Sequence, residues 1–106
     1  MDPEIERVIE AHRAELDELC RHYGVRQLEL FGSATSARFD PKWSDVDFLV
    51  EFAELDHLRY ADVYFGLVEA LEALLGRDVD LVMTSAVTNP YFLEDIAKSR
   101  TLLYAA

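Results

Sequence analysis

Basic residues, cysteine and long apolar runs are scarce in this sequence of 106 residues, and each scarcity excludes a class of protein. The chain has 10 Lys and Arg against 21 Asp and Glu, which gives a formal charge of -11. Such a chain repels phosphate backbones and anionic membrane surfaces, so we expect no direct binding of nucleic acid and no membrane association. The acidic excess suits a basic protein partner, but a surface that only keeps the protein soluble is the simpler explanation.

Cys20 is the only cysteine, which excludes an intrachain disulfide and is typical of a reducing compartment. Its apolar neighbours in a helical pattern predict a buried, inert thiol. The N-terminus lacks a basic segment followed by an apolar one, and no apolar run reaches the roughly 18 to 20 residues that a membrane span needs. We therefore expect a cytoplasmic protein without a targeting signal or membrane anchor.

The residues that are present describe one folded domain. Apolar residues make up 51% of the chain and aromatic residues 11%, and the length suits a single core. An amphipathic helix is predicted from Asp2 to Gly24, because apolar residues recur there at three- and four-residue spacings between a proline start signal and a glycine stop signal.

The rest of the chain alternates between strand and helix patterns. It predicts a strand over 25–32, a loop over 34–43, a strand over 44–52, a helix from about 56 to 76, a strand over 78–83, a helix from 90 to 97 and a short edge strand over 101–106. The apolar stripe of the long helix is expected to be Leu58, Ala61, Phe65, Val68, Leu71, Leu74 and Leu75. This order predicts an α/β (α+β) fold, a sheet with helices packed on it, as a single domain over 1–106.

Two aspartates interrupt the strand pattern "SDVDFLVEF" at 44–52. Because successive side chains of a strand alternate, Asp45 and Asp47 share one face, opposite the face of Val46 and Phe48. At about 6 Å and an effective dielectric constant of about 20, two such charges repel by almost 3 kcal/mol. The pair therefore needs an explanation, either solvent exposure at a strand end or a divalent cation that reverses the sign of the interaction.

Asp80, in the second "DVD" of the chain, is a third candidate for the same site. If its strand lies beside the strand of Asp45 and Asp47, the adjacent-strand spacing of about 4.8 Å brings it to the same point. Three carboxylates with open coordination positions suit Mg²⁺, which keeps water ligands and binds substrate phosphates as well. They do not suit a structural zinc site, because no cysteine or histidine is clustered with them.

Gly32 and Ser33 follow the first strand and form a candidate phosphate-binding turn. Glycine lets a ligand approach the backbone closely, and the amides and hydroxyl that follow could hold an anion if they begin a helix. Gly-Ser alone is more often a simple turn. Followed by a strand with paired aspartates and a third aspartate strand, it is a much more specific arrangement, because each part supplies something that metal-assisted nucleotidyl transfer requires.

These motifs resemble a known family. The stretch "LELFGSATSARFDPKWSDVDFLVEF", followed by "ALLGRDVDLV" and "NPYF", is similar to the minimal nucleotidyltransferase domains of the polymerase-beta superfamily, over nearly the whole chain. It is most similar to the MntA-type antitoxins of HEPN/MNT toxin-antitoxin systems. The resemblance implies a nucleotidyltransferase fold with a small mixed sheet, and an ATP-dependent enzyme that transfers AMP to a tyrosine of a HEPN-family RNase toxin.

The resemblance also implies a role for each candidate residue. Gly32 and Ser33 correspond to the nucleotide-binding turn, and Asp45 and Asp47 to the paired Mg²⁺ ligands. Asp80 corresponds to the third carboxylate, which either completes a second metal site or takes the proton from the attacking hydroxyl. The implied partners are therefore ATP and a HEPN toxin protein.

One departure from the family pattern separates two hypotheses. The family has Arg-Gly a few residues after Gly-Ser, where this chain has Ser36 and Ala37. Loss of a charge-assisted hydrogen bond worth about 1.5–3 kcal/mol would weaken nucleotide contact by roughly ten- to a hundredfold, unless Arg38 or Lys42 replaces it. The first hypothesis is a protein adenylyltransferase. The second is a catalytically decayed module that neutralises its toxin by binding alone, and a weaker third is nucleotide transfer to a small molecule.

Overall fold

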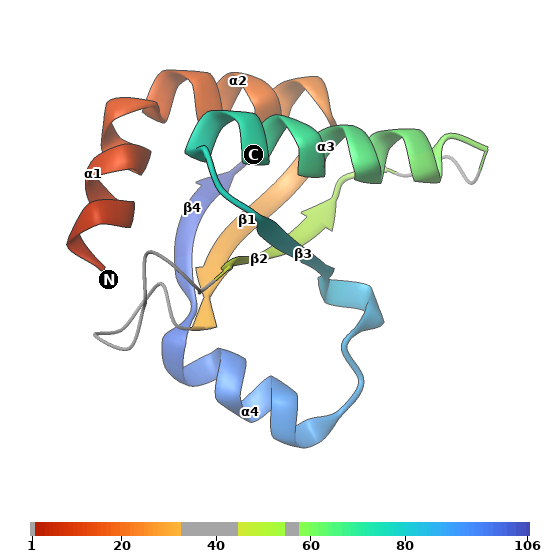
Figure 1. Cartoon of the computed structure of the whole chain (residues 1–106). Coiled ribbons are helices and arrows are strands. Elements are labelled where there is room, and N and C mark those ends of the chain that lie inside the picture. The colour runs from red at the N-terminus through yellow and green to blue at the C-terminus, as the bar shows by residue number, and fades with distance from the viewer. Residues whose placement is uncertain (1, 33–44, 55–57) are drawn as a thin grey trace.

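The computed structural model describes residues 2–32, 45–54 and 58–106 of the chain (Figure 1). Its centre is a four-stranded sheet in the order β3-β2-β1-β4. The strands are β1 (Val25–Phe31), β2 (Val46–Phe52), β3 (Val79–Met83) and β4 (Thr101–Ala105). Strand β1 pairs antiparallel with β2 and β4, whereas β2 and β3 are parallel. The predicted mixed sheet is therefore confirmed, and the last strand does form an edge.

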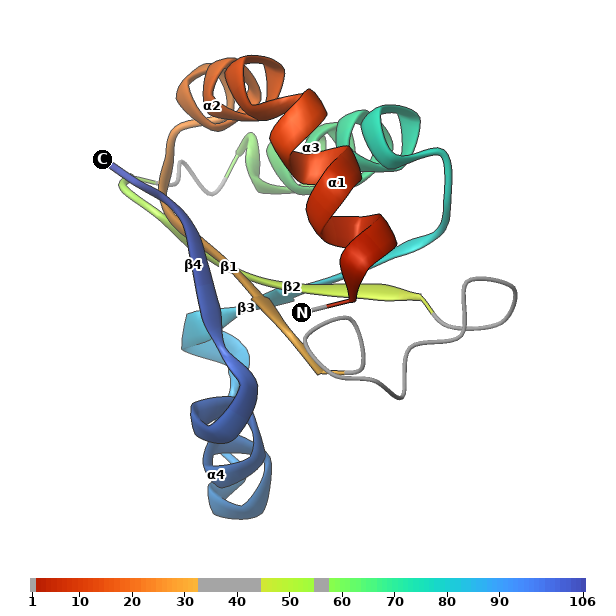
Figure 2. The same cartoon turned by 90° about the vertical axis from the view of Figure 1, so that its left-hand side faces the viewer.

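Helices cover the two faces of this sheet unequally. Figure 2 shows α1 (Pro3–Ala11), α2 (Arg13–His22) and α3 (Tyr60–Leu75) above the sheet and α4 (Pro90–Ser99) below it. A short 3₁₀ turn, η2 (Thr84–Ala86), follows β3. In the part of the chain that the structure describes, no helix is long and apolar enough to cross a membrane.

The strand alternation read from the sequence decides which residues enter which layer. Val46, Phe48 and Val50 lie in the large core under α1, α2 and α3. Leu49, between them in sequence, packs on the other face with Phe31 of β1 and Ile96 of α4. Asp47 has the parity of Leu49 and therefore belongs to the α4 face of the sheet.

The first predicted helix is in fact two helices. The break is at His12, whose backbone dihedrals (φ -116°, ψ 25°) are not helical. The sequence around it contains no proline or glycine, so the local pattern gave no signal of a break. With this bend each helix buries its own pair of apolar residues against the core, Ile5 and Ile9 in α1 and Leu16 and Cys20 in α2. The predicted burial of the Cys20 thiol is thus confirmed.

The long helix was predicted to begin too early. It begins at Tyr60, and the side chains of Leu58 and Phe65, placed by prediction on its apolar stripe, are 93% and 60% exposed. The residues of α3 that are fully buried are Leu67 and Leu71. Its end was correct, because Gly76 closes it in the left-handed conformation at φ 68°. At the other end of the chain, α4 begins as predicted with the Asn89 cap but extends to Ser99.

Candidate active site

The candidate site lies where β1 ends and where β2 and β3 begin. In the parallel register Asp47 is the direct partner of Asp80, and across the antiparallel pair Asp47 faces Phe31. The predicted adjacency of the two aspartate strands is therefore present, since paired Cα atoms of neighbouring strands are about 5 Å apart. Asp45 stands just before β2 and is exposed.

Gly32 reaches the same place from the end of β1. It has a φ of 75°, which side chains other than that of glycine rarely adopt. A Cβ atom built on Gly32 would lie 2.5 Å from Oδ2 of Asp47 and 3.4 Å from its Cγ. Only glycine leaves room for the Asp47 carboxylate here, so the turn and the paired-aspartate strand are in direct contact.

The carboxylates of the site repel one another. The pKa of Asp47 is raised to about 6, first by burial and then by the charges of Asp80 and Asp45. The pKa of Tyr64, on α3, is raised as well, first by burial and then by the charge of Asp80. Asp47 is thus the centre of an uncompensated negative charge, which costs stability in the absence of a cation.

Divalent cations with oxygen ligands fit this donor set. The three aspartates offer carboxylate oxygens only, and their mutual repulsion is the interaction that such a cation would remove. Among the described residues no three His, Cys, Asp or Glu side chains are arranged as a ready-made metal cluster. Open coordination positions, filled by water or phosphate, are what Mg²⁺ commonly uses.

Several residues named from the sequence lie outside the described part of the chain. They are Ser33 of the candidate turn, Ser36 and Ala37 at the departure from the family pattern, and the candidate substitutes Arg38 and Lys42. The ends of this segment, Gly32 and Asp45, are both described and both belong to the site.

The structure adds two residues that the sequence did not point to. Ser99, the last residue of α4, accepts a hydrogen bond from the Gly32 amide at 3.2 Å. Tyr64 reaches across the edge of the sheet and donates its hydroxyl proton to the backbone carbonyl of Leu81. Neither residue belongs to a motif. Their roles depend on contacts between segments far apart in sequence, for which a single sequence carries no signal.

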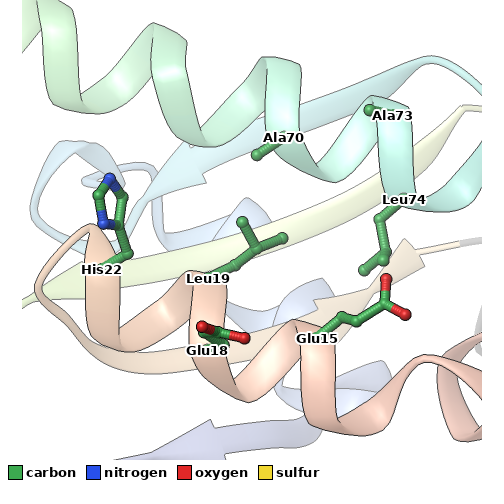
Figure 3. A pocket seen from close by; sticks show the side chains of 7 residues that line it. All are labelled: Glu15, Glu18, Leu19, His22, Ala70, Ala73 and Leu74. Atoms are coloured by element: carbon green, nitrogen blue, oxygen red, sulfur yellow. The ribbon is translucent and has the colours of Figure 1, made fainter.

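A separate hollow lies on the opposite side of the molecule, between α2 and α3 (Figure 3). Its volume is about 540 Å³. It is lined by Glu15, Glu18, Leu19, His22, Ala70, Ala73 and Leu74. Because α2 and α3 cover the face away from Asp47, this hollow has no part in the carboxylate site.

Comparison with known proteins agrees with this geometry. The sequence profile of the nucleotidyltransferase domain matches residues 13–103. The protein adenylyltransferase MntA of Thermococcus cleftensis is 44% identical over 84 residues, which are 79% of this chain and 78% of that protein. A candidate protein adenylyltransferase of Methanocaldococcus jannaschii is 38% identical over 94 residues, 88% of each chain. The chain therefore belongs to the nucleotidyltransferase domain family.

Solved structures agree as well. A candidate minimal nucleotidyltransferase superposes with a TM-score of 0.71 at 32% identity, covering 95% of both chains. A toxin-antitoxin structure with AMP-PNP has a TM-score of 0.66 at 23% identity, covering 89% of this chain and 73% of that one, and so supports the fold alone. Within the family the chain is thus a minimal nucleotidyltransferase similar to the MntA proteins, as its motifs predicted.

Proposed function

We propose that this protein is a cytoplasmic antitoxin that transfers AMP from ATP to a hydroxyl, a tyrosine, of a cognate HEPN RNase toxin. The observation that carries the proposal is the direct pairing of Asp47 with Asp80, beside Gly32, where a side chain would collide with the Asp47 carboxylate. Two relatives add support. One is an MntA adenylyltransferase by name, and a Shewanella oneidensis tri-AMPylated HEPN toxin was solved in complex with an MNT antitoxin of the same fold.

The chemistry assigns each residue a task. Asp45, Asp47 and Asp80 would hold Mg²⁺, which supplies positive charge against the triphosphate and the leaving group. The toxin hydroxyl oxygen forms a bond to the α-phosphorus, the bond from that phosphorus to the bridging oxygen of the β-phosphate breaks, and pyrophosphate leaves with its electron pair. The hydroxyl proton passes to a carboxylate, for which Asp80 is the candidate, or to water.

The acceptor must reach the α4 face of the sheet, because Asp47 lies on that face beside Leu49. The described residues form one four-stranded sheet with helices on both faces, and on the α4 face they bury only a small apolar cluster. A protein acceptor that brings its own binding surface therefore fits better than a small molecule, whose affinity would depend on a pocket. The hollow between α2 and α3 is on the wrong side for that purpose.

The experiment combines this protein, Mg²⁺, ATP labelled at the α-phosphate and the product of the neighbouring gene, followed by intact mass of both chains. We expect the mass of AMP on the partner, and at least a hundredfold less transfer with Asp47→Asn. The matched control is Asp17→Asn, the same change on α2 in the opposite layer, which should transfer at the wild-type rate.

The alternative is a module that neutralises the toxin by binding alone. It is favoured by the Ser36-Ala37 departure and predicts that the Asp45→Asn/Asp47→Asn variant silences the toxin as well as wild type does. No label on the partner, together with full neutralisation by that variant, would replace the enzyme hypothesis with this one. Label on a free small molecule without any partner protein would point to a different acceptor class.

A further inference from the structure

Ser99 and Arg100, at the junction between α4 and β4, form hydrogen bonds with β1 and with the turn that follows it. Figure 2 shows α4 below the sheet and its chain turning upward into β4, which pairs with β1. Through this junction a helix near the C-terminus contacts the turn that ends β1. The contact joins residues 67 positions apart in sequence.

Arg100 holds the junction to β1 through a bidentate ion pair with Glu29. Its Nε and Nη2 atoms donate to the two carboxylate oxygens of Glu29, each at 2.6 Å. Glu29 is the only charged residue that is buried in the described part of the chain, and Gln27 donates to it at 2.9 Å as well. A bidentate pair of this kind restricts both partners, so the end of α4 is held at one position along β1.

Ser99 connects the end of α4 to Gly32 by a hydrogen bond. Its hydroxyl oxygen accepts the Gly32 N–H at 3.2 Å, and the hydroxyl donates to the carbonyl of Asp95 one helical turn back at 3.4 Å. Gly32 in turn lies against the Asp47 carboxylate. The chain of contacts therefore runs from the α4 backbone through one hydroxyl to the glycine turn and the central aspartate.

We propose that Ser99 is a positioning residue for the nucleotide-binding turn, acting through the Gly32 amide and not through contact with the nucleotide. The inference rests on the proposed function. Since the Gly32 N–H is bonded to Ser99, Gly32 contributes space for Asp47 and the direction of the turn, and phosphate is bound by groups other than this N–H. Removing the hydroxyl takes away the bond that ties the Gly32 peptide unit, which lies against Asp47, to the end of α4.

The test uses Ser99→Ala, the conservative variant Ser99→Thr, and Ser85→Ala as the matched control. Ser85 is an exposed serine of η2. This turn follows the C-terminal end of β3, whereas Asp80 lies near the N-terminal end of that strand. Binding of Mg²⁺ with AMP-PNP is measured by calorimetry, and the Gly32 amide is followed by ¹H–¹⁵N spectra and hydrogen exchange. With an active toxin partner, KM for ATP and kcat are measured too.

We expect Ser99→Ala to weaken AMP-PNP binding and raise the KM for ATP about three- to tenfold, the size of one lost hydrogen bond. The Gly32 amide should exchange faster, the kcat should change less than the KM, and Ser99→Thr should restore all three values. Ser85→Ala should leave them unchanged. In wild type the Gly32 amide should remain protected from hydrogen exchange when the nucleotide binds.

Two results would overturn the inference. One is wild-type nucleotide affinity and unchanged Gly32 exchange in a folded Ser99→Ala variant. The other is loss of Gly32 protection in wild type on nucleotide binding, because the N–H would then leave Ser99 for the phosphate. If no AMP reaches the partner but AMP-PNP binds and responds to Ser99→Ala, the proposed transfer fails while the positioning role of Ser99 stands.

Discussion

The two faces of the sheet differ in what they bury. On the face under α1, α2 and α3, 14 buried apolar residues of the described ranges form one continuous core. On the face of α4 the buried cluster of the described residues has three, Phe31, Leu49 and Ile96, with Val82 and Val87 packed against it, and the same face carries Asp47 and Asp80. One face therefore supplies most of the hydrophobic stabilisation, and the other can hold repelling charges at Asp47 and Asp80 that the first would not tolerate.

Substitution of Phe48 tests how much the large core contributes to stability. Phe48 is 1% exposed in the large core, and Phe48→Ala should lower the free energy of unfolding by about 3–5 kcal/mol. Urea denaturation measures the change. Leu102→Ala, at a 55% exposed position of β4, is the control and should change stability by less than about 0.5 kcal/mol. Equal losses from Phe48→Ala and Leu102→Ala would contradict the burial of Phe48 in the large core.

The α4 face should also depend on the ion pair between Arg100 and Glu29. Arg100→Met removes the guanidinium and leaves the Glu29 carboxylate, whose side chain is 7% exposed, without its partner. Because Arg100 itself is 44% exposed, we expect a loss of about 2 kcal/mol, below that of a fully buried pair. The double variant Glu29→Met/Arg100→Met should recover most of it. If the double variant is as unstable as Arg100→Met, packing and not the unpaired charge is responsible.

The carboxylates of the α4 face should make stability depend on pH. The pKa of Asp47 is about 6 in the folded protein against an ordinary 3.8, so between these values the folded state binds more protons than the unfolded state. Without divalent cations, the free energy of unfolding should therefore fall as pH rises from about 4 to about 6, by about 1–2 kcal/mol after solvent screening.

Thermal melts across this range, with and without Mg²⁺, measure the effect. Asp47→Asn should remove this part of the pH dependence and be more stable than wild type at pH 7 in the absence of metal. Saturating Mg²⁺ should reduce the fall for wild type and have less effect on the variant. A variant that is less stable than wild type at pH 7 without metal would show that Asp47 makes a stabilising contact.

The smallest effect is expected at the edge of the sheet next to the site. Tyr64→Phe removes the hydroxyl that donates to the Leu81 carbonyl, and we expect a loss of about 1 kcal/mol in urea denaturation. Tyr60→Phe removes only a hydroxyl contact to the sulfur of Met83, a weak acceptor, at an exposed position. Tyr60→Phe should lower the free energy of unfolding by less than Tyr64→Phe does. The reverse order would mean that the Tyr60 hydroxyl contact to Met83 stabilises the protein more than the Tyr64 bond to the Leu81 carbonyl does.

Much of the fold could be predicted because its signals are local. The alternation at 46–52, the Gly76 stop and the Asn89 cap each depend on a few neighbouring residues, and all agree with the structure. The break at His12 and the start of α3 at Tyr60 could not be predicted, because they depend on how the helices fit the sheet. The apolar residues Leu58 and Phe65 had the right spacing but face solvent, since spacing does not say where the core lies.

The sequence by itself determined which residue types the candidate site contains, because residue types and strand parity are local properties. It predicted the strands of Asp47 and Asp80 and the turn at Gly32, and its motifs resembled the nucleotidyltransferase family to which the chain belongs. It also put Asp45 on a strand, whereas β2 begins at Val46. Only the tertiary structure decided that Asp47 and Asp80 are paired in register and that Gly32 lies against Asp47. It also brought Ser99 to the Gly32 amide. Such contacts join segments distant along the chain, and they form only when one sheet and its two faces pack together.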